Sequence, residues 1–184
     1  HDLRTPIPDE VFPERLDAIV HCAAAIDEDA KGYEVVDDNV RAAFNLVALA
    51  RARGTRTIVN LSSIAVYGSS SEGRGPVAES APLQPTTSYG LAKLLTESTL
   101  SAAGPGVAVS HLRLAYVLAP EMPERYFLVR IARRLAADEP IEIVNADTTR
   151  LSFIEVADVA CACQAALEEA ADGPFNLAAD ARPT

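Results

Sequence analysis

The stretch RTIVNLSS, residues 56–63, decides the fold of this chain. Its first seven residues are rich in β-branched and apolar side chains, which predicts a strand over 56–62 that is buried on both faces. Residues 17–21 (DAIVH) form a second short apolar run, and residues 107–114 form a third predicted strand. Strands of this kind are typical of a parallel sheet, because helices cover both of its faces.

Helical segments alternate with these strands. From residue 30 to 53, apolar residues recur three and four positions apart, and Gly54 is typical of the residue that follows a helix. Thr86 or Thr87 can cap a second helix over 88–103. The remaining predicted elements are helices over 124–137 and 156–170 and strands over 141–144 and 175–178. This alternation indicates an α/β fold with a doubly wound parallel sheet.

Composition and charge exclude several classes of protein. The 184 residues are 49% hydrophobic and 23% charged, which suits a packed core and argues against disorder. The net charge of −10 argues against a nucleic-acid binder, because such a protein needs a basic face. The sequence also lacks an apolar run of the roughly 18 residues that a membrane span requires.

The cysteines, the histidines and the two ends of the chain carry further expectations. Three cysteines without framework spacing are typical of reduced thiols in the cytoplasm. The three histidines are scattered and do not show metal-ligand spacing. Because the first residue is His1 and the chain stops abruptly at DARPT, we expect residues to be missing at both ends.

Small and polar residues follow the predicted strands at their carboxyl ends, where parallel sheets bind ligands. Alanines occupy positions 23–25, Ser62 and Ser63 follow the second strand, and Arg113 and Tyr116 lie at the end of the third. The alanines indicate either tight packing or close approach of a cofactor to the backbone.

Residues 89–93, YGLAK, place a tyrosine and a lysine one helical turn apart on the same face. A tyrosine pKa is roughly 10, so a phenol needs help to act as an acid or base at neutral pH. A neighbouring ammonium favours the phenolate, and lowering the pKa by about three units needs roughly 4 kcal/mol. Chance could place the pair together, but Lys93 is one of only two lysines in a chain whose bases are otherwise arginines.

A second element strengthens the first. Ser63 directly follows a predicted strand, and it precedes Tyr89 by 26 positions. A hydroxyl at the end of that strand can hydrogen-bond the same substrate oxygen as the tyrosine. The alternative is that Ser62 and Ser63 merely end the strand.

Together these segments resemble the extended short-chain dehydrogenases/reductases, which include UDP-galactose 4-epimerases and dTDP-glucose dehydratases. The resemblance rests on SSIAVYG at 62–68, an acidic proline-rich loop with Glu79, and YGLAK at 89–93. Further matching segments are DAIVHCAA at 17–24, DNV at 38–40, LRL at 112–114, FIEVADVA at 153–160 and FNL at 175–177.

The resemblance implies a Rossmann-like, doubly wound parallel sheet with a small C-terminal substrate lobe. The first βαβ unit of the family, with its glycine-rich phosphate loop, is absent from this sequence. Residues 1–118 and 141–172 would form the cofactor and catalytic domain. Residues 119–140 and 173–184 would form parts of the substrate lobe.

The implied function is that of an NAD- or NADP-dependent epimerase, dehydratase or ketoreductase, an oxidoreductase or isomerase that acts on a nucleotide sugar. Ser63, Tyr89 and Lys93 would catalyse the reaction, and Lys93 would also hold the nicotinamide ribose. The residues implied in cofactor binding are Asp2 and Leu3 at the adenine, together with Cys22, Ala23, Ala24, Asn39, Ser62, Tyr89 and Lys93. Nucleic acid, membrane and metal are not among the implied partners. The alternative is a non-catalytic relative that senses dinucleotide or binds a partner.

Two departures from the family concern the substrate. Tyr116 stands where relatives carry a substrate-facing asparagine, and the arginine that borders the sugar diphosphate is shifted by one position, to Arg150. Ser63, Tyr116 and Arg150 are therefore the implied substrate-binding residues, with arginines 125, 130, 133 and 134 as further phosphate candidates. A smaller, uncharged substrate is the alternative.

Relatives often dimerise through the two helices predicted at 30–53 and 88–103. We expect a homodimer, because both helices carry more leucines than one sheet face needs. The leucines concerned are Leu46, Leu49, Leu94, Leu95 and Leu100. The alternative is that all of them pack inward.

Overall fold

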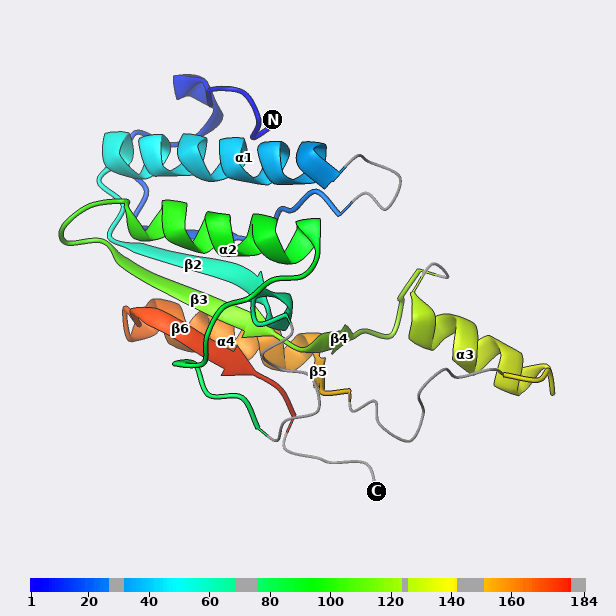
Figure 1. Ribbon diagram of the computed structural model, residues 1–184. Helices are drawn as coiled ribbons and strands as arrows, with labels where there is room; N and C mark the ends of the chain where they lie inside the picture. Colours follow the sequence, from blue (N-terminus) through cyan, green and yellow to red (C-terminus); the bar gives the residue numbers. More distant parts are fainter. Residues whose placement is uncertain (27–31, 69–75, 124–125, 142–150, 180–184) are drawn as a thin grey trace.

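The computed structural model describes residues 1–26, 32–68, 76–123, 126–141 and 151–179 (Figure 1). Its main sheet has four parallel strands in the order β1-β2-β3-β6. The strands are β1 (Ala18–His21), β2 (Thr57–Ser63), β3 (Ala108–Leu114) and β6 (Gly173–Leu177). Ser63 pairs with Leu114, and Leu114 pairs with Leu177, so these three strands end at one edge. The predicted parallel sheet is confirmed.

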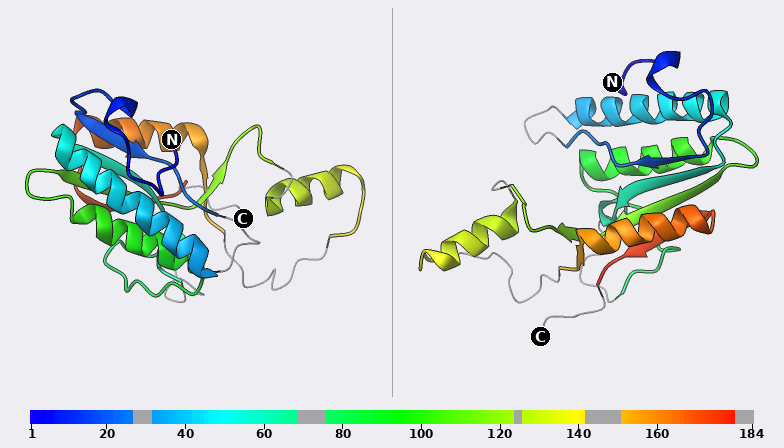
Figure 2. Two further views of the ribbon diagram at one scale, coloured as in Figure 1. Left: turned by 90° about the horizontal axis from the view of Figure 1, so that it is seen from above. Right: turned by 180° about the vertical axis from the view of Figure 1, so that it is seen from behind.

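Helices cover both faces of this sheet (Figures 1 and 2). On one face, α1 (Gly32–Arg53) and α2 (Ser88–Ser101) lie side by side, and α4 (Val156–Glu168) covers the other. The alternation of side chains along β2 explains this arrangement: Ile58 packs with the residues of α1 and α2, and its neighbour Val59 packs with α4. The doubly wound architecture is therefore confirmed.

A second, two-stranded sheet was not predicted. It pairs β4 (Tyr116–Leu118) with β5 (Phe153–Glu155) in parallel. The Ala115 N–H donates to Leu177 O, and this bond joins the second sheet to the end of the main one. Three-residue strands carry too little periodicity to be recognised in a sequence.

The helix that follows β4 is α3 (Phe127–Ala136). It projects away from the other helices in every view (Figures 1 and 2). Two short 3₁₀ helices complete the described elements, η1 (Asp9–Val11) and η2 (Ile64–Val66). Of the predicted strand at 141–144, residues 142–144 lie outside the described residues.

Part of the segment expected to belong to the substrate lobe lies in the main sheet. Gly173–Leu177 hydrogen-bonds to β3 as an edge strand, whereas residues 180–184 lie outside the described residues. The strand begins two residues earlier than predicted, at Gly173, whose φ of +96° favours glycine. Among the described residues, no helix is long and apolar enough to cross a membrane.

Candidate active site

Strand β2 ends at Ser63, where the chain enters η2. This residue has extended backbone angles (φ −147°, ψ 149°) and precedes η2. Its Oγ accepts a hydrogen bond from the Ala65 N–H at 3.2 Å, which caps the short helix. The serine is half-buried at the edge of the sheet where ligands of parallel α/β proteins bind.

Helix α2 brings Tyr89 to this serine. Thr87 caps the helix, its Oγ1 accepting from the Gly90 N–H at 3.0 Å. A Cβ on Gly90 would lie only 2.5 Å from Ala65 O, so only glycine allows the first turn of α2 to pack this closely against η2. Burial raises the pKa of the Tyr89 phenol, and a side-chain hydrogen-bonding interaction with Ser63 acts in the opposite direction.

Lys93 lies one turn further along α2 and is buried. Its Nζ donates to Leu61 O at 2.8 Å and lies 5.7 Å from the centre of the Tyr89 ring. Burial lowers the Lys93 pKa to about 8, which the opposite charge of neighbouring groups only partly offsets. Ser63, Tyr89 and Lys93 therefore come together at the end of β2.

His21 lies at the end of β1 and is also buried. Burial, and secondly the charge on Lys93, lowers the pKa of its imidazole to about 4. The ring is therefore neutral at physiological pH. It contributes no second cation beside Lys93.

The segment after β1 offers an open backbone. Cys22 and Ala23 are exposed, and Ala24 is half-buried. Two hydrogen bonds hold this segment to Asn39 of α1. The Asn39 side chain accepts from the Ala25 N–H at 3.2 Å and donates to Ala25 O at 3.1 Å. Small side chains on a backbone held this firmly fit the close approach of a dinucleotide.

Residues 6–178 match the NAD dependent epimerase/dehydratase family, which is most of the chain. The chain belongs to this family. The resemblance seen in the sequence is thereby confirmed.

Individual epimerase/dehydratase relatives support the assignment. UDP-glucose 4-epimerase 2 of Oryza sativa subsp. japonica is 40% identical over 86 residues, which are 45% of this chain and 21% of that protein. RMD from Pseudomonas aeruginosa, solved with NADPH, superposes with a TM-score of 0.82 at 26% identity, covering 97% of this chain and 65% of that one. WbmG from Bordetella bronchiseptica, solved with NAD and UDP, superposes with a TM-score of 0.77 at 26% identity. The match covers 88% of this chain and 50% of WbmG. The chain thus spans about half of WbmG.

The residues expected to bind the adenine lie beside α1. Asp2 forms an ion pair with Arg4 at 2.7 Å, and Arg4 also reaches Asp38, the neighbour of Asn39, at 3.3 Å. The hydrogen bonds from Arg4 lower the Asp2 pKa to about 2. Leu3 packs against the core beneath α1. The sequence did not predict that Arg4 would engage the Asp2 carboxylate.

Ser62, Tyr116 and Arg150 are the remaining expected site residues. Ser62 is buried and its Oγ donates to Glu97 Oε1 at 2.5 Å, so its side chain faces the interior, and its part in cofactor binding stays a prediction. Tyr116 starts β4 beyond the sheet edge and is 52% exposed, with its ring tilted against that of Phe153. Arg150 lies outside the described residues.

Sequence reasoning missed the partners of Arg113. The guanidinium forms a two-pronged ion pair with Glu97 of α2, and both side chains are buried. It also donates to the hydroxyl of Tyr67 at 2.8 Å. One signal was available: Glu97 follows Lys93 by four residues and must share its buried helix face.

Proposed function

We propose that this chain carries the catalytic residues of an NAD- or NADP-dependent epimerase, dehydratase or ketoreductase that acts on a nucleotide sugar. The observation that supports it is the meeting of Ser63, Tyr89 and Lys93 at the end of β2, in a chain of the epimerase/dehydratase family. The dinucleotide, when bound, supplies the hydride chemistry.

In this proposal Tyr89 moves the proton of the substrate hydroxyl. Burial keeps the phenol protonated at neutral pH, so in the protein alone Tyr89 is an acid. Acting as a base requires its pKa to fall, and positive charge nearby lowers it. Lys93 supplies that charge below its own pKa of about 8. The Ser63 hydroxyl shares the substrate oxygen and orients it for transfer.

Lys93 has a second proposed task. One of its three protons is used by Leu61 O, which fixes the ammonium against β2. The remaining protons are available to hydroxyls of a nicotinamide ribose placed beside Cys22 and Ala23. In the same proposal Asp2 and Leu3 border the adenine, Ala24 lines the cofactor, and Asn39 holds that segment in shape.

The substrate is proposed to lie between Ser63 and the chain beyond β3. Tyr116 is exposed there, and α3 lies away from the main sheet, so we keep residues 119–140 as part of the proposed substrate lobe. Exposed arginines of α3, such as Arg130, are candidates for the diphosphate, together with Arg150. An enzyme with three free thiols would be expected to work in the cytoplasm.

A direct assay tests this function. The whole protein should convert UDP- or dTDP-sugars with NAD or NADP, and millimolar UDP or dTDP should raise its unfolding temperature. If neither nucleotide protects the protein and the UDP- and dTDP-sugars are not converted, while a smaller hydroxyl compound is oxidised, the redox chemistry stands and the nucleotide sugar is excluded. If turnover is absent while the dinucleotide still binds, the non-catalytic alternative is correct.

We also propose a homodimer through the outer faces of α1 and α2. Of the five leucines considered for it, Leu46, Leu49 and Leu100 pack inward, Leu94 is half-buried and Leu95 is 37% exposed. Three further apolar residues of the two helices are available to such an interface. These are Tyr33, Phe44 and Leu91, all exposed.

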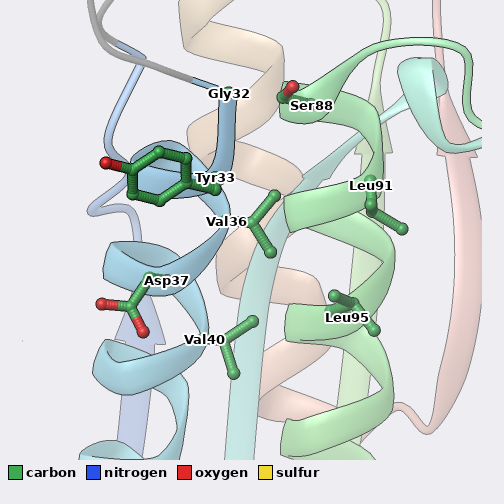
Figure 3. A pocket seen from close by; sticks show the side chains of 8 residues that line it. All are labelled: Gly32, Tyr33, Val36, Asp37, Val40, Ser88, Leu91 and Leu95. Atoms are coloured by element: carbon green, nitrogen blue, oxygen red, sulfur yellow. The ribbon is translucent and has the colours of Figure 1, made fainter.

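Figure 3 shows how the two helices form this surface: Val36 and Val40 of α1 face Leu91 and Leu95 of α2 across an apolar groove. Sedimentation of the whole protein at micromolar concentration should give the mass of a dimer. The double substitution Leu91→Asp and Leu95→Asp should give a monomer. A monomeric parent would contradict the dimer.

A further inference from the structure

A buried polar network lies directly beneath the catalytic residues. At its centre, Arg113 Nε donates to Glu97 Oε1 at 3.0 Å and Nη2 donates to Oε2 at 2.8 Å. The two side chains are only 4% and 6% exposed. Ser62 Oγ donates to the same Glu97 oxygen at 2.5 Å. The carboxylate thus joins α2 to β2 and to β3 at one point.

The other side of Arg113 extends the network to the loop that precedes α2. Its Nη1 donates to the Tyr67 hydroxyl at 2.8 Å and to Glu79 O at 3.1 Å. The fully buried Tyr67 in turn donates to Asn176 Oδ1 of β6 at 2.7 Å. Asn176 then donates from its amide to Val77 O at 2.7 Å. Through these bonds one guanidinium is tied to α2, to β6 and to the loop that precedes α2, and through Glu97 to β2.

Stability is a poor explanation for this arrangement. Removing two charges from water costs about as much as their attraction returns, so apolar residues of equal volume would stabilise the interface as well or better. A forked guanidinium on a carboxylate does fix distance and orientation. Glu97 lies one and two helical turns after Lys93 and Tyr89, and Ser62 adjoins Ser63. Each catalytic residue is therefore one short step from the network.

We propose that Glu97, Arg113 and Tyr67 are positioning residues, which hold α2 against the ends of β2 and β3 so that Tyr89 and Ser63 address the same substrate oxygen. This inference rests on the proposed function. It adds residues that do not touch substrate or cofactor and act only through the geometry of the three that do.

Kinetics of the whole protein test the proposal. Glu97→Gln removes the charge and keeps the shape, and it should lower kcat on the order of 10- to 100-fold, the cost of a misplacement of about 1 Å. The KM for the dinucleotide should stay within about threefold, because the backbone after β1 is untouched. Arg113→Lys keeps the positive charge but should lower kcat as Glu97→Gln does, since one ammonium cannot reach Glu97 and Tyr67 together. Tyr67→Phe is the milder variant if the others fail to fold.

Ser101→Ala is the matched control. Its hydroxyl lies 2.9 Å from His111 Nε2, so it joins the same two elements, α2 and β3, away from the catalytic residues. It should leave kcat within twofold. If Ser101→Ala lowers kcat as much as Glu97→Gln, or if Glu97→Gln retains the parent kcat, the positioning role is wrong.

A structural readout separates this proposal from the proposed function. If the parent has no turnover, the function fails, and a crystal structure of Glu97→Gln still decides on positioning. The Lys93 Nζ to Leu61 O contact, 2.8 Å in the parent, should lengthen beyond hydrogen-bond distance. An unchanged contact would overturn the positioning role.

Discussion

The two ends of the interface between α2 and the sheet are built from opposite chemistry. Towards the amino ends of the strands, Leu100 packs on Ile58 and Val109 in an apolar cluster, beside the uncharged Ser101–His111 hydrogen bond. Towards the carboxyl ends, the same helix places Lys93 and Glu97 on the same strands, and both are buried. Burying apolar surface stabilises a fold, whereas burying charge opposes it. The apolar end therefore stabilises the packing of α2 on the sheet. This stabilisation offsets the cost of burying Lys93 and Glu97 at the polar end.

Tyr89→Phe should give the largest effect, at the polar end. The variant removes the hydroxyl that is proposed to move the proton and keeps the ring, so kcat should fall about a thousandfold, within the range of general acid–base catalysis. The unfolding temperature should change little, because the side chain is only partly buried and the variant keeps the ring. Steady-state kinetics and thermal unfolding check both statements. Turnover within a few-fold of the parent would show that another group carries the proton. For comparison, Ser63→Ala should lower kcat less than Tyr89→Phe does.

Leu100→Ala tests the apolar end. Leu100 is fully buried, and truncating such a side chain costs about 3 kcal/mol of unfolding free energy. The kcat of the folded protein should remain near that of the parent. Denaturant titration measures the loss, and Leu135→Ala on α3, a leucine 64% exposed, serves as the control with little expected change. A large fall in kcat for Leu100→Ala would mean that the two ends are not separate.

The two ends also differ in how far the sequence predicts them. The apolar end follows from periodicity, because hydrophobic residues on a helix and on neighbouring strands must meet, and the predicted elements there are confirmed. At the polar end, the YGLAK spacing placed Tyr89 and Lys93 on one face, and the structure brings them to Ser63.

The partners of a buried charge, by contrast, depend on tertiary packing. The sequence did not show that the Ser62 side chain bonds to Glu97, a residue 35 positions away. The strands β4 and β5 were not predicted because three residues carry too little periodicity, and their pairing joins segments distant in sequence. Local patterns therefore predict elements and faces, and they do not predict which polar groups pair.

Lys93→Met should show the cost of the buried cation as a function of pH. The Lys93 pKa falls from 10.5 to about 8 on folding. Between these values the folded protein binds fewer protons than the unfolded chain, so stability rises with pH across this window. The parent should gain about 2 kcal/mol relative to Lys93→Met between pH 8 and 10.5, somewhat less than the full shift implies. Denaturant titrations at several pH values measure the difference, and parallel curves would contradict the lowered pKa.

Thr87→Ala should produce the smallest change in stability and kcat. Thr87 is the N-cap of α2, at the polar end of the interface. The Thr87 hydroxyl accepts from the Gly90 N–H, so its loss leaves the first turn of α2 without its side-chain cap and costs about 1 kcal/mol. Thr87→Ser keeps the hydroxyl and should restore most of that stability. The kcat should fall only a few-fold, because the close contact of Gly90 with Ala65 still holds the turn that carries Tyr89. A loss of kcat comparable to that of Tyr89→Phe would show that the cap, and not this packing, places the phenol.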